Sequence, residues 1–269
     1  MNILVIIEHK NGVMHRMSKE AIAGAQKIGG NVTALVIGEN SDSITDELSS
    51  FQIEKTLLVT NEKVTSYNVD GYKEIILQVV KVVNPEFIIT GHTYQARDFM
   101  PRLSASLDIP FIPDLVSVEN SSYTKQIMNS KLNASISSSN GPVLISFQSA
   151  SFSEENISKG SSPLEKFEVN LDASNIRSTV DEPFQESASE VDLESAELIV
   201  SVGRGIEKEE NKSIAFDLAE VLGAEVSASR PVVDAGWLPS SRQVGSSGST
   251  VSPKSVSYTH LTLPTKRIV

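Results

Sequence analysis

Polar and cationic side chains gather late in the chain, where neither helical nor strand spacing is visible. Residues 228–239 read ASRPVVDAGWLP, and residues 243–254 read QVGSSGSTVSPK. Glycines let a backbone approach a ligand closely, hydroxyl groups donate hydrogen bonds, and Arg230 supplies a fixed positive charge. We therefore predict that this region wraps a polar ligand with backbone N–H groups and does not build a core.

Two shorter motifs point to the same chemistry. Gly203-Arg204-Gly205 follows an apolar run and precedes a helical pattern, a position where a backbone can bind an anion. Ser229-Arg230 follows the next predicted strand, at the carboxyl edge where open α/β sheets bind ligands. A plain turn at the first motif and a surface ion pair at the second are the simpler interpretations.

The elements that must position these residues follow an alternating pattern. Continuous apolar runs separated by amphipathic segments predict an α/β domain with a parallel sheet covered on both faces. The predicted strands are residues 3–7, 32–37, 56–59 and 87–90, and the predicted helices are residues 17–28, 43–51, 72–83 and 96–107.

The pattern changes after Pro110. Short strand-like pieces at 115–118, 131–136 and 143–147 predict a β-rich extension, and an acidic, polar segment at 177–197 predicts a linker. A second α/β unit has strands at 198–202 and 225–228 around a helix at 213–222. We thus divide the chain into a Rossmann-like domain at 1–190, an incomplete domain at 191–254 and a tail at 255–269.

Composition excludes several classes of protein. With 39% hydrophobic and 21% charged residues, the chain is typical of a globular protein, and the absence of cysteine excludes disulfides and thiolate metal sites. The net charge of -11 argues against binding of nucleic acid, because its phosphates would be repelled. No run approaches the roughly 18 apolar residues of a membrane helix, and the first residues lack a leader pattern. We expect a cytoplasmic protein without membrane insertion.

The chain resembles the alpha subunit of electron transfer flavoproteins over residues 1–254. In the first domain the resemblance rests on residues 6–9 (IIEH) and 29–36 (GGNVTALV), and on 97–98 (RD) with 101–103 (PRL). In the second it rests on the combination and order of residues 201–205 (SVGRG), 229–230 (SR) with 233–237 (VDAGW), and 243–245 (QVG).

The resemblance implies an FAD held mainly by the second domain. The residues that line up with flavin contacts are Arg204, Ser229, Arg230, Gln243, Val244, Gly245, Ser246 and Ser247. An arginine near the N1–C2=O edge of the flavin would favour its reduction, and a hydroxyl donor in the 243–250 loop would face N5. The family usually has threonine at the position of Ser247 and often lysine at that of Ser249.

The resemblance also implies partners. It predicts a heterodimer with a beta subunit that holds AMP, and an electron carrier that is not a stand-alone enzyme. It implies transfer of electrons from acyl-CoA dehydrogenases of fatty acid β-oxidation and related flavoenzymes to a membrane quinone reductase. The family continues past residue 254 with further cofactor contacts, so we expect a fragment with an incomplete FAD site, and residues 255–269 resemble translated adapter sequence.

Two alternatives remain open at this stage. Residues 1–110 could form a nucleotide-binding regulatory module of the universal stress protein type, although no glycine-rich phosphate loop lies between residues 86 and 176. The other alternative is a bifurcating or carnitine-pathway relative of the same alpha family. His9, His15 and His92 show no metal spacing. Gly91-His92-Thr93 follows a strand and could touch a ligand, but Arg97-Asp98 is as easily a local ion pair.

Overall fold

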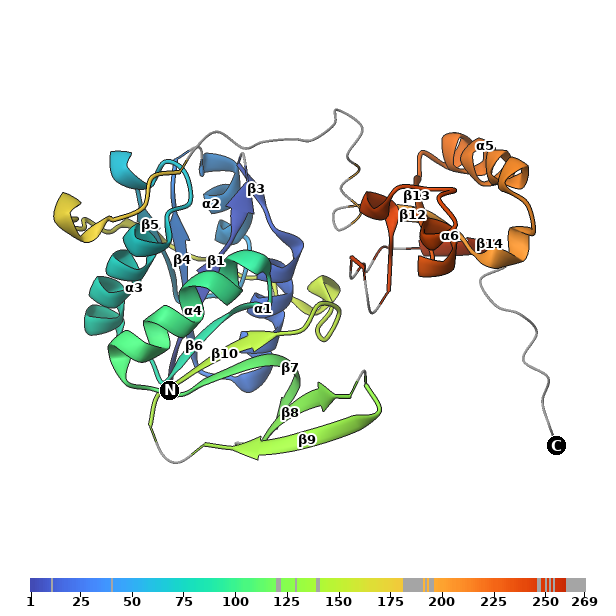
Figure 1. Cartoon of the computed structure of the whole chain (residues 1–269). Coiled ribbons are helices and arrows are strands. Elements are labelled where there is room, and N and C mark those ends of the chain that lie inside the picture. The colour runs from blue at the N-terminus through green and yellow to red at the C-terminus, as the bar shows by residue number, and fades with distance from the viewer. Residues whose placement is uncertain are drawn as a thin grey trace. The chain divides into compact units, whose positions relative to one another are not determined.

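The computed structural model divides the chain into two compact units, residues 1–182 and 183–269, which we describe separately (Figure 1). The described residues are 1–10, 12–39, 41–119, 122–128, 130–138, 141–180, 191, 193, 196–245, 248–249, 251, 253 and 255–259. The predicted domain boundary at residue 190 and the acidic stretch at 181–190 lie outside them, so that boundary stays a prediction.

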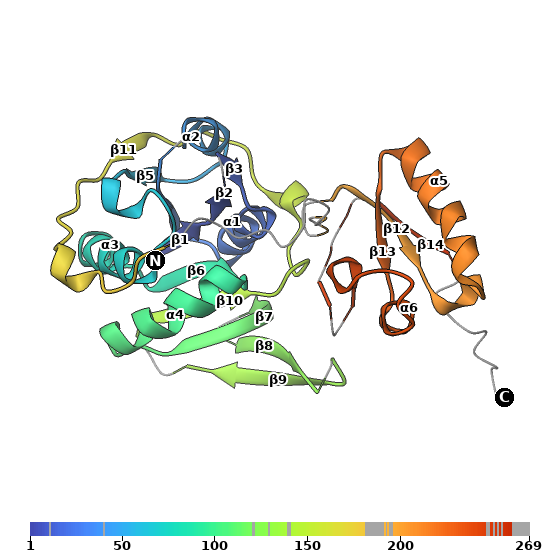
Figure 2. The same ribbon diagram turned by 45° about the horizontal axis from the view of Figure 1, so that its top comes forward.

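A nine-stranded mixed sheet forms the middle of the first unit. Its order is β11 (Leu164–Lys166), β5 (Lys55–Val59), β4 (Asn31–Ile37), β1 (Asn2–Ile7), β6 (Phe87–Gly91), β10 (Val143–Phe147), β7 (Phe111–Glu119), β8 (Ser122–Ile127) and β9 (Leu132–Ser137). Neighbours from β11 to β7 pair in parallel, whereas β7, β8 and β9 pair antiparallel. The predicted α/β fold is confirmed (Figure 2). Of the three pieces of the predicted β-rich extension, 115–118 lies within β7 and 131–136 largely coincides with β9, whereas 143–147 is β10, a parallel strand between β6 and β7.

Helices cover both faces of this sheet. On one face α1 (Arg16–Ile28) and α2 (Asp42–Ser49) pack into one apolar cluster, and on the other α3 (Val69–Val83) and α4 (Tyr94–Leu107) pack into a second. Successive strand residues alternate between the two clusters: Ile3 and Val5 face the first, and Leu4 and Ile6 face the second. This two-sided burial is the reason that β1 reads as one continuous apolar run.

The helices begin earlier than their apolar spacing indicates, because polar caps precede the first apolar residue. The Asn68 side chain accepts hydrogen bonds from the backbone N–H groups of Asp70 and Gly71, and α3 starts at Val69 rather than at the predicted residue 72. Likewise, the Thr93 hydroxyl accepts from Ala96 N, and α4 starts at Tyr94 rather than at 96.

Some strands were not predicted. β8 is mostly polar and half-buried, and β11 is a three-residue edge strand, so neither shows a clear apolar pattern. A small antiparallel hairpin, β2 (His9–Lys10) with β3 (Val13–Met14), also lies between β1 and α1.

The second unit is a small α/β unit. Its sheet has the order β13 (Glu225–Ala228), β12 (Leu198–Val202) and β14 (Ser255–Thr259), all parallel. Helix α5 (Lys212–Leu222) connects β12 to β13 and packs on them through Ala215 and Ala219. Strands β12 and β13 match their predicted bounds.

Two segments of this unit differ from the sequence-based expectations. Residues 255–259, which we excluded from the fold as part of a tail, pair with β12 over its full length. The segment after β13, where no helix was expected, contains α6 (Arg230–Asp234). Pro231 lies in its first turn, where the fixed φ of proline suits a helix and its missing N–H costs nothing.

Candidate functional site

The predicted ligand-binding segments meet at the carboxyl edge of the second unit's sheet. Ser229 N donates to the carbonyl of Val202 at 2.9 Å, and Val244 N donates to the carbonyl of Ala228 at 3.0 Å. The ends of β12 and β13 and the loop that starts at Gln243 therefore lie side by side. Open α/β sheets bind ligands at such an edge.

The Gly203-Arg204-Gly205 motif forms a different turn from the predicted one. Residues Arg204–Ile206 make one 3-10 turn, and Glu207 leaves it with φ of 67°. Helix α5 begins only at Lys212, so the motif does not open a long helix whose dipole could hold an anion. The Arg204 side chain is exposed, and the first N–H groups of the turn have no acceptor within it.

Ser229 and Arg230 begin α6. The backbone carbonyl of Ser229 accepts from Val232 N at 2.9 Å, but the Ser229 hydroxyl makes no capping hydrogen bond and stays available to a ligand. Arg230 Nε lies 3.5 Å from Asp234 Oδ2, and both side chains are about two-thirds exposed. The simpler interpretation, a surface ion pair, therefore describes Arg230 in this structure, and such a pair is weak enough to be exchanged for a ligand.

The loop after Gln243 uses its backbone donors internally. Gly245 N donates to Ser249 O at 3.2 Å, Gly248 N to Gly245 O at 3.0 Å, and Ser249 N to Gln243 O at 2.8 Å. A Cβ on Gly248 would lie 2.4 Å from Gln243 O, so the loop closes this tightly only with glycine there. In this structure these three N–H groups already have acceptors within the loop, and the expectation that the loop wraps a ligand with its backbone N–H groups stays a prediction. Ser246 and Ser247 lie outside the described residues.

Arg242 anchors this loop, and the sequence-based prediction missed it. Its Nη1 donates to the carbonyl of Val226 at 2.7 Å and lies 3.7 Å from Glu225 Oε2. Gln243, the next residue, is buried and pairs with Ala228 through an isolated bridge. A basic residue just before a glycine-rich loop was the available signal, but its acceptors come from β13, which the local sequence does not reveal.

Together these residues form a polar edge with two exposed guanidinium groups. Arg204, Ser229, Arg230, Gln243, Val244 and Gly245 all belong to this edge or to the loop that pairs with it. Exposed guanidinium groups and a free hydroxyl suit an anionic or strongly polar ring, because charged hydrogen bonds are the strong ones. The residues present thus fit a polar cofactor through side chains more than through the loop's N–H groups.

The first unit carries a second polar cluster at the carboxyl end of its own sheet. His92 Nδ1 lies 2.8 Å from Ser146 Oγ, and Arg97 Nε donates to His92 Nε2 at 3.2 Å, so the interpretation of Arg97-Asp98 as an ion pair is not supported. Burial lowers the pKa of His92, whereas the negative charge of Asp114 raises it.

Among the described residues no group of three histidine or acidic side chains could hold a metal ion, and none of the described helices is long and apolar enough to span a bilayer.

Two family models match the chain. One described as an electron transfer flavoprotein domain covers residues 3–172. Another, described as an electron transfer flavoprotein FAD-binding domain, covers residues 192–257. The second match includes both guanidinium groups of the polar edge and its glycine-rich loop.

Curated relatives match along nearly all of the chain. Electron transfer flavoprotein subunit alpha of Bacillus subtilis (strain 168) is 32% identical over 259 residues, which cover 93% of this chain and 79% of the relative. The subunit of the same name from Thermoanaerobacterium thermosaccharolyticum is 31% identical over 264 residues, covering 94% and 80%. A probable mitochondrial alpha subunit from Caenorhabditis elegans is 30% identical over 256 residues, covering 93% and 76%.

Proposed function

The chain belongs to the family of electron transfer flavoprotein alpha subunits, electron carriers, and we propose from this membership that it holds one FAD at the polar edge of its second unit. The observation that carries the proposal is the meeting of three separate segments at that edge. The ends of β12 and β13 and the 243–249 loop are joined by the hydrogen bonds of Ser229 N and Val244 N.

Each proposed contact has a physical reason. Bound FAD would supply the redox centre that accepts and releases electrons. Arg204 and Arg230 would offer positive charge to its anionic and carbonyl groups, and the free Ser229 hydroxyl would donate a hydrogen bond. Val244, Gly245 and the buried Gln243 would form the wall of the site, because Arg242 and the loop's own hydrogen bonds hold them in place. Roles for Ser246 and Ser247 stay predictions.

The partners are proposed on the same basis. An electron carrier needs a donor and an acceptor, and we propose acyl-CoA dehydrogenases and related flavoenzymes as donors and a membrane quinone reductase as acceptor. We propose a beta subunit carrying AMP as the permanent partner, and a cytoplasmic location.

One observation bears on the alternative nucleotide-binding module. The nucleotide crevice of a doubly wound sheet opens where the strand order reverses, here between β1 and β6. Glu8 follows β1, and its Oε2 accepts a hydrogen bond from Thr93 Oγ1 at the start of α4 at 2.5 Å. A carboxylate in that position disfavours a phosphate group, and we therefore do not propose nucleotide binding by the first unit.

An FAD titration tests the proposed site. The complex of the chain with its beta subunit is titrated with FAD, and binding is followed by the change in flavin fluorescence. Arg230→Gln should weaken FAD binding about tenfold, because a hydrogen bond to a charged group contributes about 1.5 kcal/mol or more.

Arg177→Gln is the matched control, because Arg177 is an exposed arginine of the first unit. It should leave the dissociation constant unchanged. A complex that binds no flavin at any FAD concentration would contradict the proposed function. Equal affinities of the two variants would contradict the role of Arg230 alone.

A further inference from the structure

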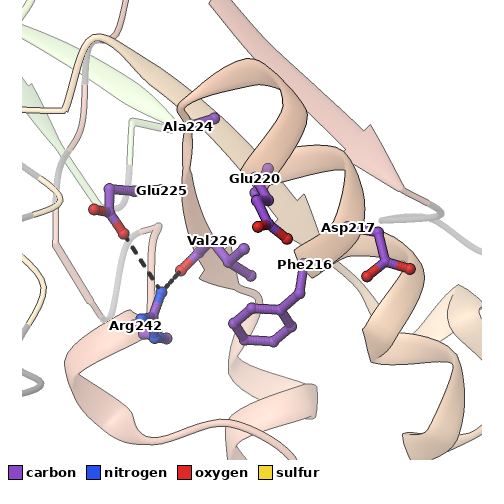
Figure 3. Close-up of a pocket in the computed structure, with 8 residues that line it drawn as sticks. Phe216, Asp217, Glu220, Ala224, Glu225, Val226 and Arg242 are labelled. Carbon is purple, nitrogen blue, oxygen red and sulfur yellow. Dashed lines mark hydrogen bonds and ion pairs between the residues drawn. The ribbon is translucent and has the colours of Figure 1, made fainter.

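A pocket of about 270 Å³ lies in the second unit, beside β13, an edge strand of the three-stranded sheet. Its wall combines α5, the start of β13 and Arg242 (Figure 3). In this view Glu225 and Arg242 lie on one side, and Phe216 and Glu220 of α5 lie on the other. The flavin-related residues discussed above are not among those that line the pocket, although Gln243 directly follows Arg242.

The pocket wall already binds one guanidinium group. The Arg242 guanidinium carbon lies 5.7 Å from the centre of the Phe216 ring, within the range of a cation–π contact. Its Nη1 donates to Val226 O at 2.7 Å and lies 3.7 Å from Glu225 Oε2. An aromatic face, a carboxylate and a backbone carbonyl are therefore arranged here to suit a planar cation.

The pocket holds more negative charge than Arg242 neutralises. Three carboxylates line it, those of Asp217, Glu220 and Glu225, against one guanidinium. Within the described parts of the chain, Asp217 and Glu220 make no ion pair, and they lie three residues apart on α5, where like charges repel. Binding a second cation would relieve this repulsion.

The surface around the pocket is apolar as well as acidic. On α5, Ile214 is 63% exposed, Val221 84% and Leu222 47%. Ile214 and Val221 are seven residues apart, so they lie on the same side of the helix, with Asp217 between them. Large exposed apolar side chains concentrated on one short helix are typical of a binding surface.

We propose that this pocket and the exposed side of α5 dock a partner polypeptide that presents an arginine flanked by apolar side chains. The partner's guanidinium enters beside Phe216 and pairs with Glu220, as that of Arg242 pairs with Glu225. The flanking apolar side chains cover Ile214 and Val221. The charge of the pocket selects a basic partner, and the apolar helix side supplies the buried area. This docking does not rest on the flavin assignment.

Nuclear magnetic resonance with a minimal probe tests the proposal. The ¹⁵N-labelled chain is titrated with acetyl-Leu-Arg-Leu-amide and, separately, with the same peptide carrying citrulline, a neutral analogue of arginine. We expect saturable shifts at Phe216, Glu220 and Glu225 with the arginine peptide, and at least threefold weaker binding of the citrulline peptide.

Two substitutions sharpen this experiment. Glu220→Gln should weaken binding of the arginine peptide about threefold, and Glu210→Gln, which removes an exposed carboxylate outside the pocket, should not change it. Equal binding of both peptides, equal binding by both variants, or shifts confined to other regions would overturn the proposal. So would self-association of the chain that buries α5 and that the arginine peptide does not reverse.

Discussion

At the scale of single residues, Glu20 is a buried charged group of the first unit. Its side chain is 1% exposed, its Oε2 accepts a hydrogen bond from Ala150 N at 2.8 Å, and its Oε1 lies 3.3 Å from Arg16 Nε. Burial raises the pKa of Glu20 above the ordinary value of 4.5, Ala150 and Arg16 lower it, and Glu154 raises it further. The carboxylate therefore joins α1 to the loop after β10 at an electrostatic cost.

Because burial of Glu20 raises its pKa, we predict that its contribution to folding stability depends on pH. A carboxyl group with a raised pKa in the folded state favours folding most when it is protonated, so its contribution to stability declines as pH rises above 4.5. Glu20→Gln keeps an acceptor for Ala150 N and removes the charge. Urea unfolding at pH 5 and pH 7.5 should show the variant gaining stability relative to the natural chain at the higher pH. A relative loss at pH 7.5 would mean that the Arg16 pair outweighs burial.

At the scale of elements, the close contact between α1 and β10 depends on Gly24. A Cβ at this position would lie 2.5 Å from Cε2 of Phe147, which is itself fully buried at the end of β10. Glycine weakens a helix, so its presence in the middle of α1 has a packing reason. The helix can lie against the sheet at this depth only because residue 24 has no side chain.

Gly24→Ala should lower the free energy of unfolding by about 1 kcal/mol. Overpacking costs about 1–3 kcal/mol, and the higher helix propensity of alanine returns about 0.5–1 kcal/mol. Urea unfolding measures the change. In a double-mutant cycle with Phe147→Leu, which removes the ring edge, the same alanine should cost less. An equal cost in both backgrounds would exclude the predicted clash.

At the scale of the whole molecule, the two units differ in the size of their cores. The first buries two large apolar clusters on the two faces of its sheet, while the second buries one small cluster around Val200, Val226 and Val232. Hydrophobic stabilisation increases with the apolar area removed from water, so the second unit should be less stable.

The single tryptophan makes this difference measurable. Trp237 is partly buried against the core of the second unit, whereas most helices and strands belong to the first. During urea unfolding, tryptophan fluorescence should change at a lower urea concentration than far-ultraviolet circular dichroism. Coincident transitions would mean that the two units unfold as one cooperative block.

The sequence by itself determined the fold class and most element positions. Strands β10, β12 and β13 match their predicted bounds, because fully buried strands carry continuous apolar runs that need no tertiary information. Polar or very short strands such as β8 and β11 were missed, since the pairing that stabilises them is made with residues distant in the chain.

The sequence also selected the residues of the polar edge, whose contacts with FAD stay predictions. Only the tertiary structure decided which groups there are free. In the structure the N–H groups of Gly245 and Gly248 donate to carbonyls of the loop itself, and Arg230 pairs with Asp234. Arg242 donates a hydrogen bond to the carbonyl of Val226 in β13. A hydrogen bond depends on where its partner lies in space, and residue type states only what a group can donate or accept.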